Sequence, residues 1–522
     1  MVEEQKVERC PRCGAELDEN IRSLLQSEAT FCPRKTCGVQ LTEDDGGNLR
    51  IRTFRLNNHY SYCVLPFAFF HFEGENCFED LRRSSRWEQK IFSMDDPDDV
   101  ERTEYFLPYV KRFLFPSLFR KDVNSPEYEP TCQHFHFDLS LLGGSREDGL
   151  PLTMRCENVR KKVSYDYDLK LSDIELLVFN YRVAFLNFRF EHTSPMATYF
   201  DQMDATHFFR LIAPLYREFQ MPEFAAGDKQ FYMSQLLPYL LAEFDKGSRP
   251  PAHPSDLDKD SELPVQVIYD DRMMVYTFSC INRKMTLNDL ARAENLLERD
   301  AIVNLNPDLK TNPPGPGEGD EEKDWLRQRW QGLSKEGATL VVFDIDRFHS
   351  KYLGEYNSSY YMDIFLLATL QRVTLLLLFE RLSDIEGLTS PSWGSGKALR
   401  RLRKDLLMFK NQSWFSQISN RERGLVLWRR WQNVFENKML LEEVNEQSKE
   451  LDAYLQNRTR EKIEWGMRLG GFMATAIPAI FGLELLLGKA PWVASLRWVL
   501  ISILILGSGV FAWFVFFGSE DT

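Results

Sequence analysis

Two long apolar runs lie close together near the C-terminus: LGGFMATAIPAIFGLELLL at Leu469–Leu487 and WVLISILILGSGVFAWFVFF at Trp498–Phe517. A helix needs about 20 apolar residues to cross the hydrocarbon core of a bilayer, and both runs meet that length. The second run has no charge and no polar face, which disfavours a buried helix of a soluble protein. We therefore predict a two-helix transmembrane hairpin in residues 466–522, surrounded by membrane lipid.

The charges beside the two runs predict the orientation of the hairpin. Lys489 and Arg497 lie in the short connection between the runs, whereas more basic residues precede the first run. Basic residues collect on the cytoplasmic side of a membrane, so both termini should be cytoplasmic. This predicts a multi-pass protein of the cell inner membrane. The basic residues before the first run are Arg458, Arg460, Lys462 and Arg468.

Pro478 and Glu484 are unusual residues for a membrane-spanning helix. Proline leaves a backbone carbonyl without its helical partner, and that carbonyl can line a water-filled path. A carboxylate is costly in lipid unless it faces protein or water. Glu484 either reaches the nearby membrane interface or contributes to a ring of carboxylates at a pore mouth. We name Pro478 and Glu484 as candidate pore residues.

Composition limits the functions of the rest of the chain. The 522 residues have a net charge of −13, which argues against a nucleic-acid surface as the main function. The nine cysteines are scattered, and residues 1–9 have no apolar signal region, so a reducing cytosol is expected for the body. We find no P-loop, dinucleotide-binding glycine pattern or nucleophile elbow, and the sequence favours a protein that is not an enzyme.

Four cysteines near the N-terminus have the spacing of a zinc ribbon. Cys10 and Cys13 form a first pair, and Cys32 and Cys37 form a second pair. Tetrahedral zinc takes four thiolates, and a unit this small needs the metal in order to fold. We predict structural zinc bound by these four cysteines. The alternative is that they are unligated thiols in an N-terminal tail.

Residues 49–345 read as an α+β domain. Asp173–Glu191 predicts two strands around Asn180-Tyr181, and Val265–Phe278 predicts a hairpin that turns at Asp270-Asp271. Residues 338–344 read as a buried strand. Helical patterns lie at 203–217, 228–244 and 287–299, and exposed linkers are expected at 246–264 and 306–323.

Residues 346–465 read as a helical hairpin that ends in a long stalk. Tyr360–Glu386 predicts a buried helix, because Gln371 and Arg372 interrupt its apolar core. Residues 397–465 contain no proline and are rich in helix-forming residues, so we predict one long helix that continues toward the first apolar run. In its second half, Leu441, Val444, Leu451 and Leu455 follow a heptad pattern interrupted by Ser448.

Two groups of metal-ligand residue types occur in the body. Cys132, His134, His136 and Asp138 alternate and should share one face of a strand. Neighbours on one strand face diverge by nearly 7 Å, so ordinary strand packing is favoured over a metal site. Asp344 and Asp346, with His349, follow a strand and are more typical of an acidic loop or helix cap than of a ligand site.

The order of these parts resembles the CorA-type divalent-cation channel superfamily. The shared organisation is an α/β body, a helical hairpin, a long stalk helix and two C-terminal spans, and it covers roughly residues 340–517. The resemblance implies a homo-oligomer, a pentamer in that family, with five first spans around a pore for metal cations. The family's Gly-Met-Asn filter motif is absent, since Leu487-Gly488-Lys489-Ala490 stands in its place, and the basic tail is replaced by GSEDT.

Two functions follow as expectations. The first is a CorA-like homo-oligomeric cation channel or transporter that is gated by its cytoplasmic domain. A channel of this kind could serve as a signal-gated effector. The alternative is a non-conducting membrane-anchored sensor or interaction protein whose zinc ribbon recruits a partner. The expected fold is an N-terminal zinc ribbon in residues 1–48, an α+β cytoplasmic body, a long stalk helix and a C-terminal transmembrane hairpin.

Overall fold

The structure is a computed structural model of the chain, which divides into two compact units. The first unit comprises Met1–Val373 and Phe415–Glu436, and the second comprises Thr374–Trp414 and Asn437–Thr522. The residues that the structure describes are 30–31, 40–43, 49–52, 54–69, 77–119, 130–158, 163–180, 182–195, 197–213, 221–245, 251–259, 261–269, 271–282, 329–343, 351–387, 395–451, 453, 454, 457, 460, 464, 467, 468, 471 and 499.

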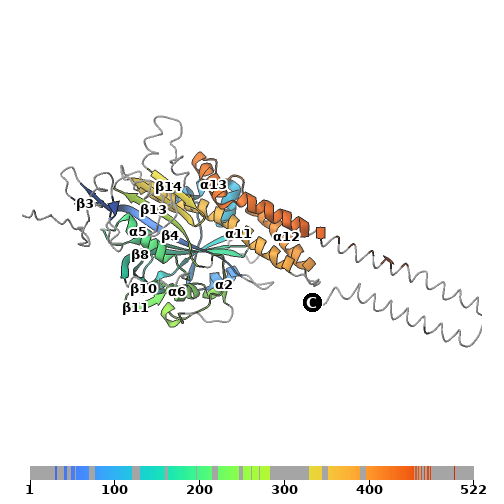
Figure 1. Cartoon of the computed structure of the whole chain (residues 1–522), viewed down its shortest axis with the longest axis horizontal. Coiled ribbons are helices and arrows are strands. Elements are labelled where there is room, and N and C mark those ends of the chain that lie inside the picture. Colours follow the sequence, from blue (N-terminus) through green and yellow to red (C-terminus); the bar gives the residue numbers. More distant parts are fainter. Residues whose placement is uncertain are drawn as a thin grey trace, which may run out of the picture. The chain divides into compact units, whose positions relative to one another are not determined.

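The first unit is built on one large mixed sheet of 12 strands (Figure 1). The strands are β4 (Leu56–Ala68), β5 (Trp87–Lys90), β6 (Cys132–Phe137), β7 (Leu150–Asn158), β8 (Val163–Phe179), β9 (Val183–His192), β10 (Glu223–Ala226), β11 (Lys229–Tyr232), β12 (Gln266–Val267), β13 (Met274–Ile281), β14 (Arg329–Ser334) and β15 (Gly337–Phe343). Nine of them follow the order β11-β10-β7-β8-β9-β4-β13-β15-β14, while β12 pairs with β4 and β6 pairs with both β5 and β8. The predicted α+β fold class is confirmed at this level.

The hairpin of β8 and β9 confirms the two strands predicted around Asn180-Tyr181. The strands pair antiparallel from Leu169 opposite His192 to Phe179 opposite Val183. Arg182 in the turn has a φ of 65°, and its carbonyl accepts a hydrogen bond from the amide of Phe69 at 3.1 Å. The long apolar strands place this hairpin near the centre of the sheet. The predicted buried strand at 338–344 is likewise confirmed as β15.

One face of the sheet packs against an apolar layer of helices. Leu176, Leu186 and Phe188 belong to its core, together with residues of the covering helices. Burial of this apolar surface is the main stabilising contribution to the unit. The helices are α2 (Cys77–Arg83), α5 (Tyr199–Phe209) and α6 (Met233–Leu240), and α5 begins at a Thr198–Asp201 capping box.

The opposite face of the sheet has polar and aromatic side chains. The hydroxyl of Tyr60 donates to the carbonyl of Gly354 at 2.7 Å, and that of Tyr276 donates to Asn357 at 2.9 Å. These bonds attach the sheet to the chain just before helix α11. The helices of this side are α3 (Pro97–Glu104), α4 (Pro108–Leu114), α10 (Leu353–Tyr356), α11 (Met362–Gly387) and α13 (Glu422–Phe435).

The hairpin predicted at Val265–Phe278 is wrong. β12 and β13 both pair antiparallel with β4, one after the other, so the chain does not reverse between them. The connecting loop is held instead by the residues that follow α5, because the amide of Ile212 donates to the carbonyl of Asp271 and the amide of Met273 donates to the carbonyl of Arg210. A loop of turn-forming residues therefore joins two collinear strands, which local sequence does not distinguish from a hairpin.

Part of the predicted linker 246–264 packs against the sheet rather than standing exposed. His253 is 2% exposed, and its ring lies 5.7 Å from that of Phe231 on β11. The side chain of Gln235 on α6 donates to the carbonyl of Leu257. The described residues of this segment thus belong to the folded body.

The single long helix predicted over residues 397–465 is also wrong. Helix α12 (Ser395–Gln412) ends before α13, and Glu436 after α13 adopts a left-handed conformation with a φ of 54°. In the first break the amide of Leu107 donates to the carbonyl of Ile418 at 2.8 Å, and Ser419 Oγ donates to the carbonyl of Tyr105 at 2.6 Å. At the second break Arg372 donates to the carbonyl of Phe435. Tertiary hydrogen bonds override helix propensity at both places.

The second unit is helical where the structure describes it. The end of α11, α12 and a helix from residue 437 to 451 share a core that includes Leu378, Leu402 and Phe409. Val444 and Leu451 of the predicted heptad lie in this core, and Leu441 packs against it. Because α11 begins in the first unit and ends in the second, one continuous helix joins them.

Among the described residues, one helical stretch is long and apolar enough to cross a membrane, Leu353–Ser383. Leu366, Leu370 and Val373 within it are at most 1% exposed. The predicted buried helix at Tyr360–Glu386 is therefore confirmed, and α11 is a core helix of the protein. The hairpin predicted in residues 466–522, including Pro478 and Glu484, lies almost wholly outside the described residues, as does Leu455.

A separate three-stranded antiparallel sheet is formed near the N-terminus. Its order is β1 (Thr30–Phe31), β2 (Gln40–Glu43) and β3 (Leu49–Arg52). Thr30 lies opposite Leu41, and Gln40 lies opposite Arg52. The predicted zinc ligands Cys10, Cys13, Cys32 and Cys37 lie outside the described residues, as do Asp344, Asp346, His349 and the linker 306–323.

Candidate ligand-binding site

Six polar side chains occupy neighbouring positions on the central strands β6, β8 and β9. In the strand register His136 lies opposite Glu175, Glu175 lies opposite Asn187, and Asp173 lies opposite Arg189. Residues that pair directly, and residues two apart on one strand, point to the same face of a sheet. We call these six residues the polar cluster: His134, His136, Asp173, Glu175, Asn187 and Arg189.

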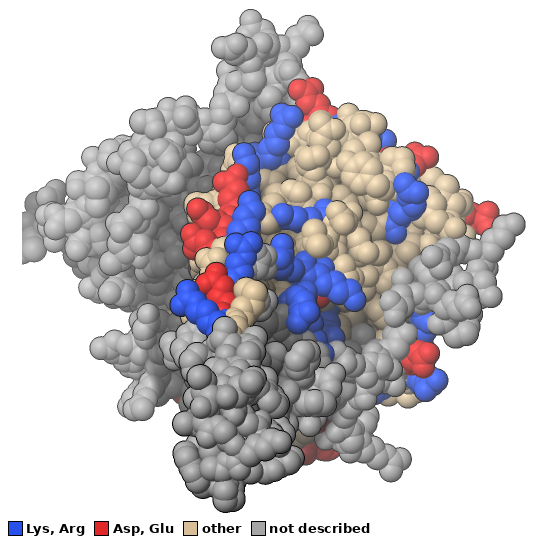
Figure 2. Space-filling view, turned by 90° about the vertical axis from the view of Figure 1, so that its right-hand side faces the viewer, with Lys and Arg blue, Asp and Glu red and all other residues tan. Residues whose placement is uncertain are grey.

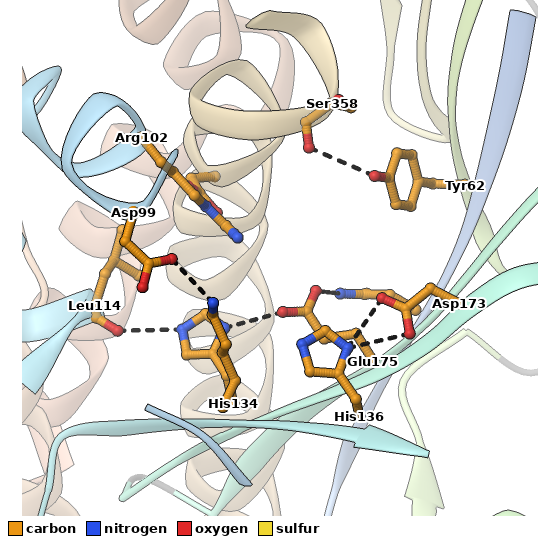
Figure 3. Close-up of polar contacts among 12 residues, drawn as sticks. Tyr62, Asp99, Arg102, Leu114, His134, His136, Asp173, Glu175 and Ser358 are labelled. Carbon is orange, nitrogen blue, oxygen red and sulfur yellow. Dashed lines mark hydrogen bonds and ion pairs between the residues drawn. The ribbon is translucent and has the colours of Figure 1, made fainter. Parts of the chain in front are cut away.

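The inner row of the polar cluster is a buried, hydrogen-bonded chain (Figure 3). His134 Nδ1 lies 3.0 Å from Glu175 Oε1, and His134 Nε2 lies 3.1 Å from the carbonyl oxygen of Leu114 on α4. Asn187 Nδ2 donates to the other oxygen of Glu175 at 3.4 Å. The carbonyl oxygen of Leu114 can only accept, so Nε2 of His134 donates to it, and Nδ1 forms the hydrogen bond with Glu175.

The charge of Glu175 is stabilised by its neighbours despite burial. Burial alone would raise the pKa of Glu175, but the hydrogen bond from His134 and the charges of His134 and Arg102 lower it to about 2. Glu175 therefore remains ionised at neutral pH inside the protein. A buried ion pair with additional hydrogen bonds costs little when complete and much when one partner is removed.

The outer row of the polar cluster lies closer to solvent. His136 Nδ1 is 3.0 and 3.1 Å from the two carboxylate oxygens of Asp173, as Figure 3 shows. Burial lowers the pKa of His136, but the hydrogen bond and charge of Asp173 outweigh that effect, and the pKa is raised. His136 therefore retains a proton to higher pH than an isolated histidine does.

Arg189 completes the outer row and is held by aromatic rings rather than by a carboxylate. Its guanidinium carbon lies 5.0 Å from the ring centre of Tyr60 and 5.7 Å from that of Tyr62. Cation–π contacts of this kind hold the guanidinium plane without using its N–H donors. The hydroxyl of Tyr62 in turn points at the carbonyl of Ser358, at 3.4 Å, in the chain that precedes α11 (Figure 3).

A buried ion pair connects this side of the sheet to α11. Arg102 of α3 donates to both oxygens of Asp363, at 2.7 and 2.5 Å, and Asp363 is 1% exposed. Asp363 lies in the first turn of α11, where a negative charge also interacts favourably with the helix dipole. The start of α11 is thus fixed to the body by a bidentate pair near Glu175.

A cavity of about 560 Å³ opens beside the outer row. Its volume lies within the range of about 300–1,000 Å³ that is common for small-molecule sites. His136, Asp173 and Arg189 line it from the sheet, and Ser85 and Arg146 line it from the connections that follow α2 and precede β7. Polar and apolar groups converge on it, which is the arrangement expected of a binding pocket.

The strand of alternating metal-ligand types forms as expected but does not gather a metal set. Among the described residues, no three His, Cys, Asp or Glu side chains lie close enough to hold a metal ion. His134 and His136 each bind a carboxylate of β8, Cys132 is buried, and Asp138 accepts from the amide of Ser140 as the cap of the short helix η2 (Leu139–Leu142).

Asp173, Glu175 and Arg189 were not predicted from the sequence as functional residues. A signal existed, because polar or charged residues stand at alternate positions of otherwise apolar strands in DIELL at 173–177 and in NFR at 187–189. Such residues are rarely buried without partners, so the alternation points to a polar partner across the sheet. Identification of that partner as the strand with His134 and His136 required the sheet order.

Comparison of the chain with protein-family models, with curated proteins and with solved structures finds no match.

Proposed function

We propose that the chain is a membrane effector of CorA-like organisation. In this proposal the α+β body binds a small ligand, and the C-terminal hairpins of several copies form a cation path that the body controls. The body and both termini are cytoplasmic, and the protein is a multi-pass component of the inner membrane. Zinc bound by Cys10, Cys13, Cys32 and Cys37 is structural, and the position of Cys32 and Cys37 between the antiparallel strands β1 and β2 supports a knuckle there.

The observation that carries the proposal is the continuity of α11. Its first turn is held in the body by Arg102 and Asp363, and its last turns pack in the second unit with the helix 437–451. That helix precedes the first apolar run in sequence. Because α11 contributes residues to both units, we propose that it carries a change at the body toward the hairpin.

Exposed apolar side chains support the membrane part of the proposal. Met467 is 64% exposed and Val499 is 56% exposed, and both are helical. Large apolar groups left uncovered in a single chain are expected to be covered by lipid or by other copies.

Basic surface supports a position beside an anionic leaflet. Figure 2 shows Lys and Arg side chains gathered on the described surface that faces the viewer. In the second unit, Arg400, Arg403 and Lys404 of α12 line an open groove of about 430 Å³. Basic residues close to the cytoplasmic leaflet are attracted by anionic lipid headgroups.

Cation flux through reconstituted vesicles tests conduction. Glu484→Gln removes the carboxylate and keeps the size, so it should reduce flux or shift cation-over-anion selectivity, because a carboxylate ring concentrates cations at a pore mouth. Glu450→Gln changes an exposed helical glutamate and serves as the control. If Glu484→Gln matches the unmodified protein in flux and selectivity, the carboxylate ring is refuted.

A non-conducting membrane-anchored sensor is the second candidate. The cavity beside the outer row of the polar cluster favours it equally, since a ligand-binding body serves either function. Absence of the Gly-Met-Asn motif favours the sensor over a magnesium channel. Vesicles that pass no ion under any condition, with the protein inserted, would leave this candidate as the better one.

A further inference from the structure

The charged side chains that line the cavity differ in whether they have hydrogen-bond partners within the protein. Its three carboxylates all have partners: Asp173 binds His136, Glu88 binds Arg146 at 2.6 Å, and Asp138 accepts from the amide of Ser140. Each carboxylate that lines the cavity therefore has at least one partner within the protein.

Arg189 is the lining cation whose donors are unused among the described residues. Its contacts there are with the rings of Tyr60 and Tyr62 and with its strand neighbours, and its guanidinium donates to none of their oxygens. Asp173, directly opposite it on β8, is bound to His136 instead. A guanidinium presents paired N–H donors that match the two oxygens of a carboxylate or phosphate.

We propose that this cavity binds a small organic molecule through a carboxylate or phosphate group held by Arg189. The rings of Tyr60 and Tyr62 hold the guanidinium in place before the ligand arrives, which reduces the entropy lost on binding. The inference rests on the proposed role of the body as the ligand-binding part of the protein. It does not require that the hairpin conducts ions.

Arg146 and His136 give the oxyanion further partners. The Arg146–Glu88 pair is highly exposed, with side chains 72% and 68% accessible, so it is weak and Arg146 can turn to a ligand at little cost. His136 lines the same cavity and is held from behind by Asp173. Ser85, which is exposed, adds a hydroxyl at the edge. Arg146, His136 and Ser85 thus line the same cavity as Arg189.

Calorimetric titration of the full chain in detergent tests the proposal. Inorganic phosphate and succinate are the two probes, and saturable binding of one or both is expected, with the better probe identifying the oxyanion. Arg189→Gln should weaken that binding by about tenfold or more, because a bidentate charge-assisted pair is lost. Arg155→Gln on β7 is the matched control, since Arg155 is exposed and pairs with Asp166 outside the cavity.

Two further variants keep the test decisive if Arg189→Gln does not fold. Arg189→Lys retains the charge and should bind more weakly than the unmodified protein, because an ammonium cannot form the fork. Ser85→Trp fills the edge of the cavity from an exposed position. It should block binding while the temperature of thermal unfolding stays unchanged.

No saturable binding of either probe up to about 10 mM would overturn the proposal. Equal affinity in the unmodified, Arg189→Lys and Ser85→Trp proteins would also overturn it. Since ion flux is not measured here, that failure would be distinct from a failure to conduct.

Discussion

Glu175 is the residue on which the polar face of the sheet depends most. It accepts hydrogen bonds from His134 and Asn187, and it lies near Arg102. Each partner comes from a different element: β6, β9 and α3. One buried carboxylate thus organises the contact between the sheet and the helices that cover it.

Replacement of Glu175 by Gln should destabilise the protein by roughly 3 kcal/mol, because it removes the buried negative charge that faces His134 and Arg102. Chemical denaturation of the full chain in detergent measures the change. Glu157→Gln, an exposed glutamate on β7, is the control and should change stability by less than about 0.5 kcal/mol. Equal effects of the two substitutions would contradict the role of Glu175.

Acid should remove the contribution of Glu175 in a defined pH window. Its folded pKa of about 2 is below the value of about 4.3 for a free glutamate, so its contribution is complete above about pH 4.3 and is lost as pH falls toward 2. The stability of the unmodified protein should fall more steeply over this window than that of Glu175→Gln. Parallel pH profiles would show that Glu175 is not the titrating group.

The four N-terminal cysteines should bind one zinc ion per chain. Elemental analysis of the full chain, purified without chelator, should find one equivalent, and Cys10→Ser should lower it, since three thiolates hold structural zinc less tightly than four. Cys156→Ser changes a buried cysteine of β7 and should leave the zinc content intact. Absence of stoichiometric zinc in the unmodified protein would refute the zinc ribbon.

At the scale of elements, the entry to β15 depends on one glycine. Gly337 has a φ of 143°, and a Cβ there would lie 1.8 Å from the carbonyl oxygen of Val275. This close approach begins the parallel pairing of β13 with β15. Glycine is required here both by the backbone conformation and by the space.

Gly337→Ala should therefore cost more than about 3 kcal/mol or prevent folding, because backbone atoms cannot yield as a side chain does. Thermal unfolding and the yield of folded protein measure it. Gly227→Ala is the matched control: its φ of 57° is also positive, but a Cβ there meets nothing within 4 Å. Only the strain of about 1–2 kcal/mol is expected at Gly227. Equal losses at both positions would argue against the close approach as the cause.

Helices and strands were predictable from the sequence where a long apolar run lay within one segment of the chain. The β8–β9 hairpin and the buried helix α11 followed from apolar runs broken by recognisable turns or polar residues. Long-range partners were not predictable. The loop after β12 is held by the residues that follow α5. The breaks on either side of α13 are held by Tyr105, Leu107 and Arg372, which are distant in sequence.

In the candidate site, too, local features were predictable from the sequence and long-range partners were not. The shared face of His134 and His136 followed from strand alternation alone. Their carboxylate partners lie about 40 residues away on β8, at Asp173 and Glu175, and depended on a register that the sequence does not specify. Two of the six residues of the polar cluster, His134 and His136, were therefore predictable from the sequence, and the other four depended on the sheet order.

At the scale of the whole molecule, one copy does not provide a pore. The predicted hairpin has two spans, and two helices enclose no aqueous path, so conduction requires several copies around an axis. The resemblance to the CorA-type superfamily implies five. An oligomer would also cover the exposed apolar side chains of Met467 and Val499 or turn them to lipid.

The subunit number of the detergent-solubilised full chain is the most direct test of the proposed effector. Single-particle imaging should show a symmetric ring of several copies, with the C-terminal hairpins inside the detergent belt, because only such a ring places Pro478 and Glu484 around a common path. A uniform population of monomers or dimers, in a protein that remains folded and inserted, would contradict the cation path.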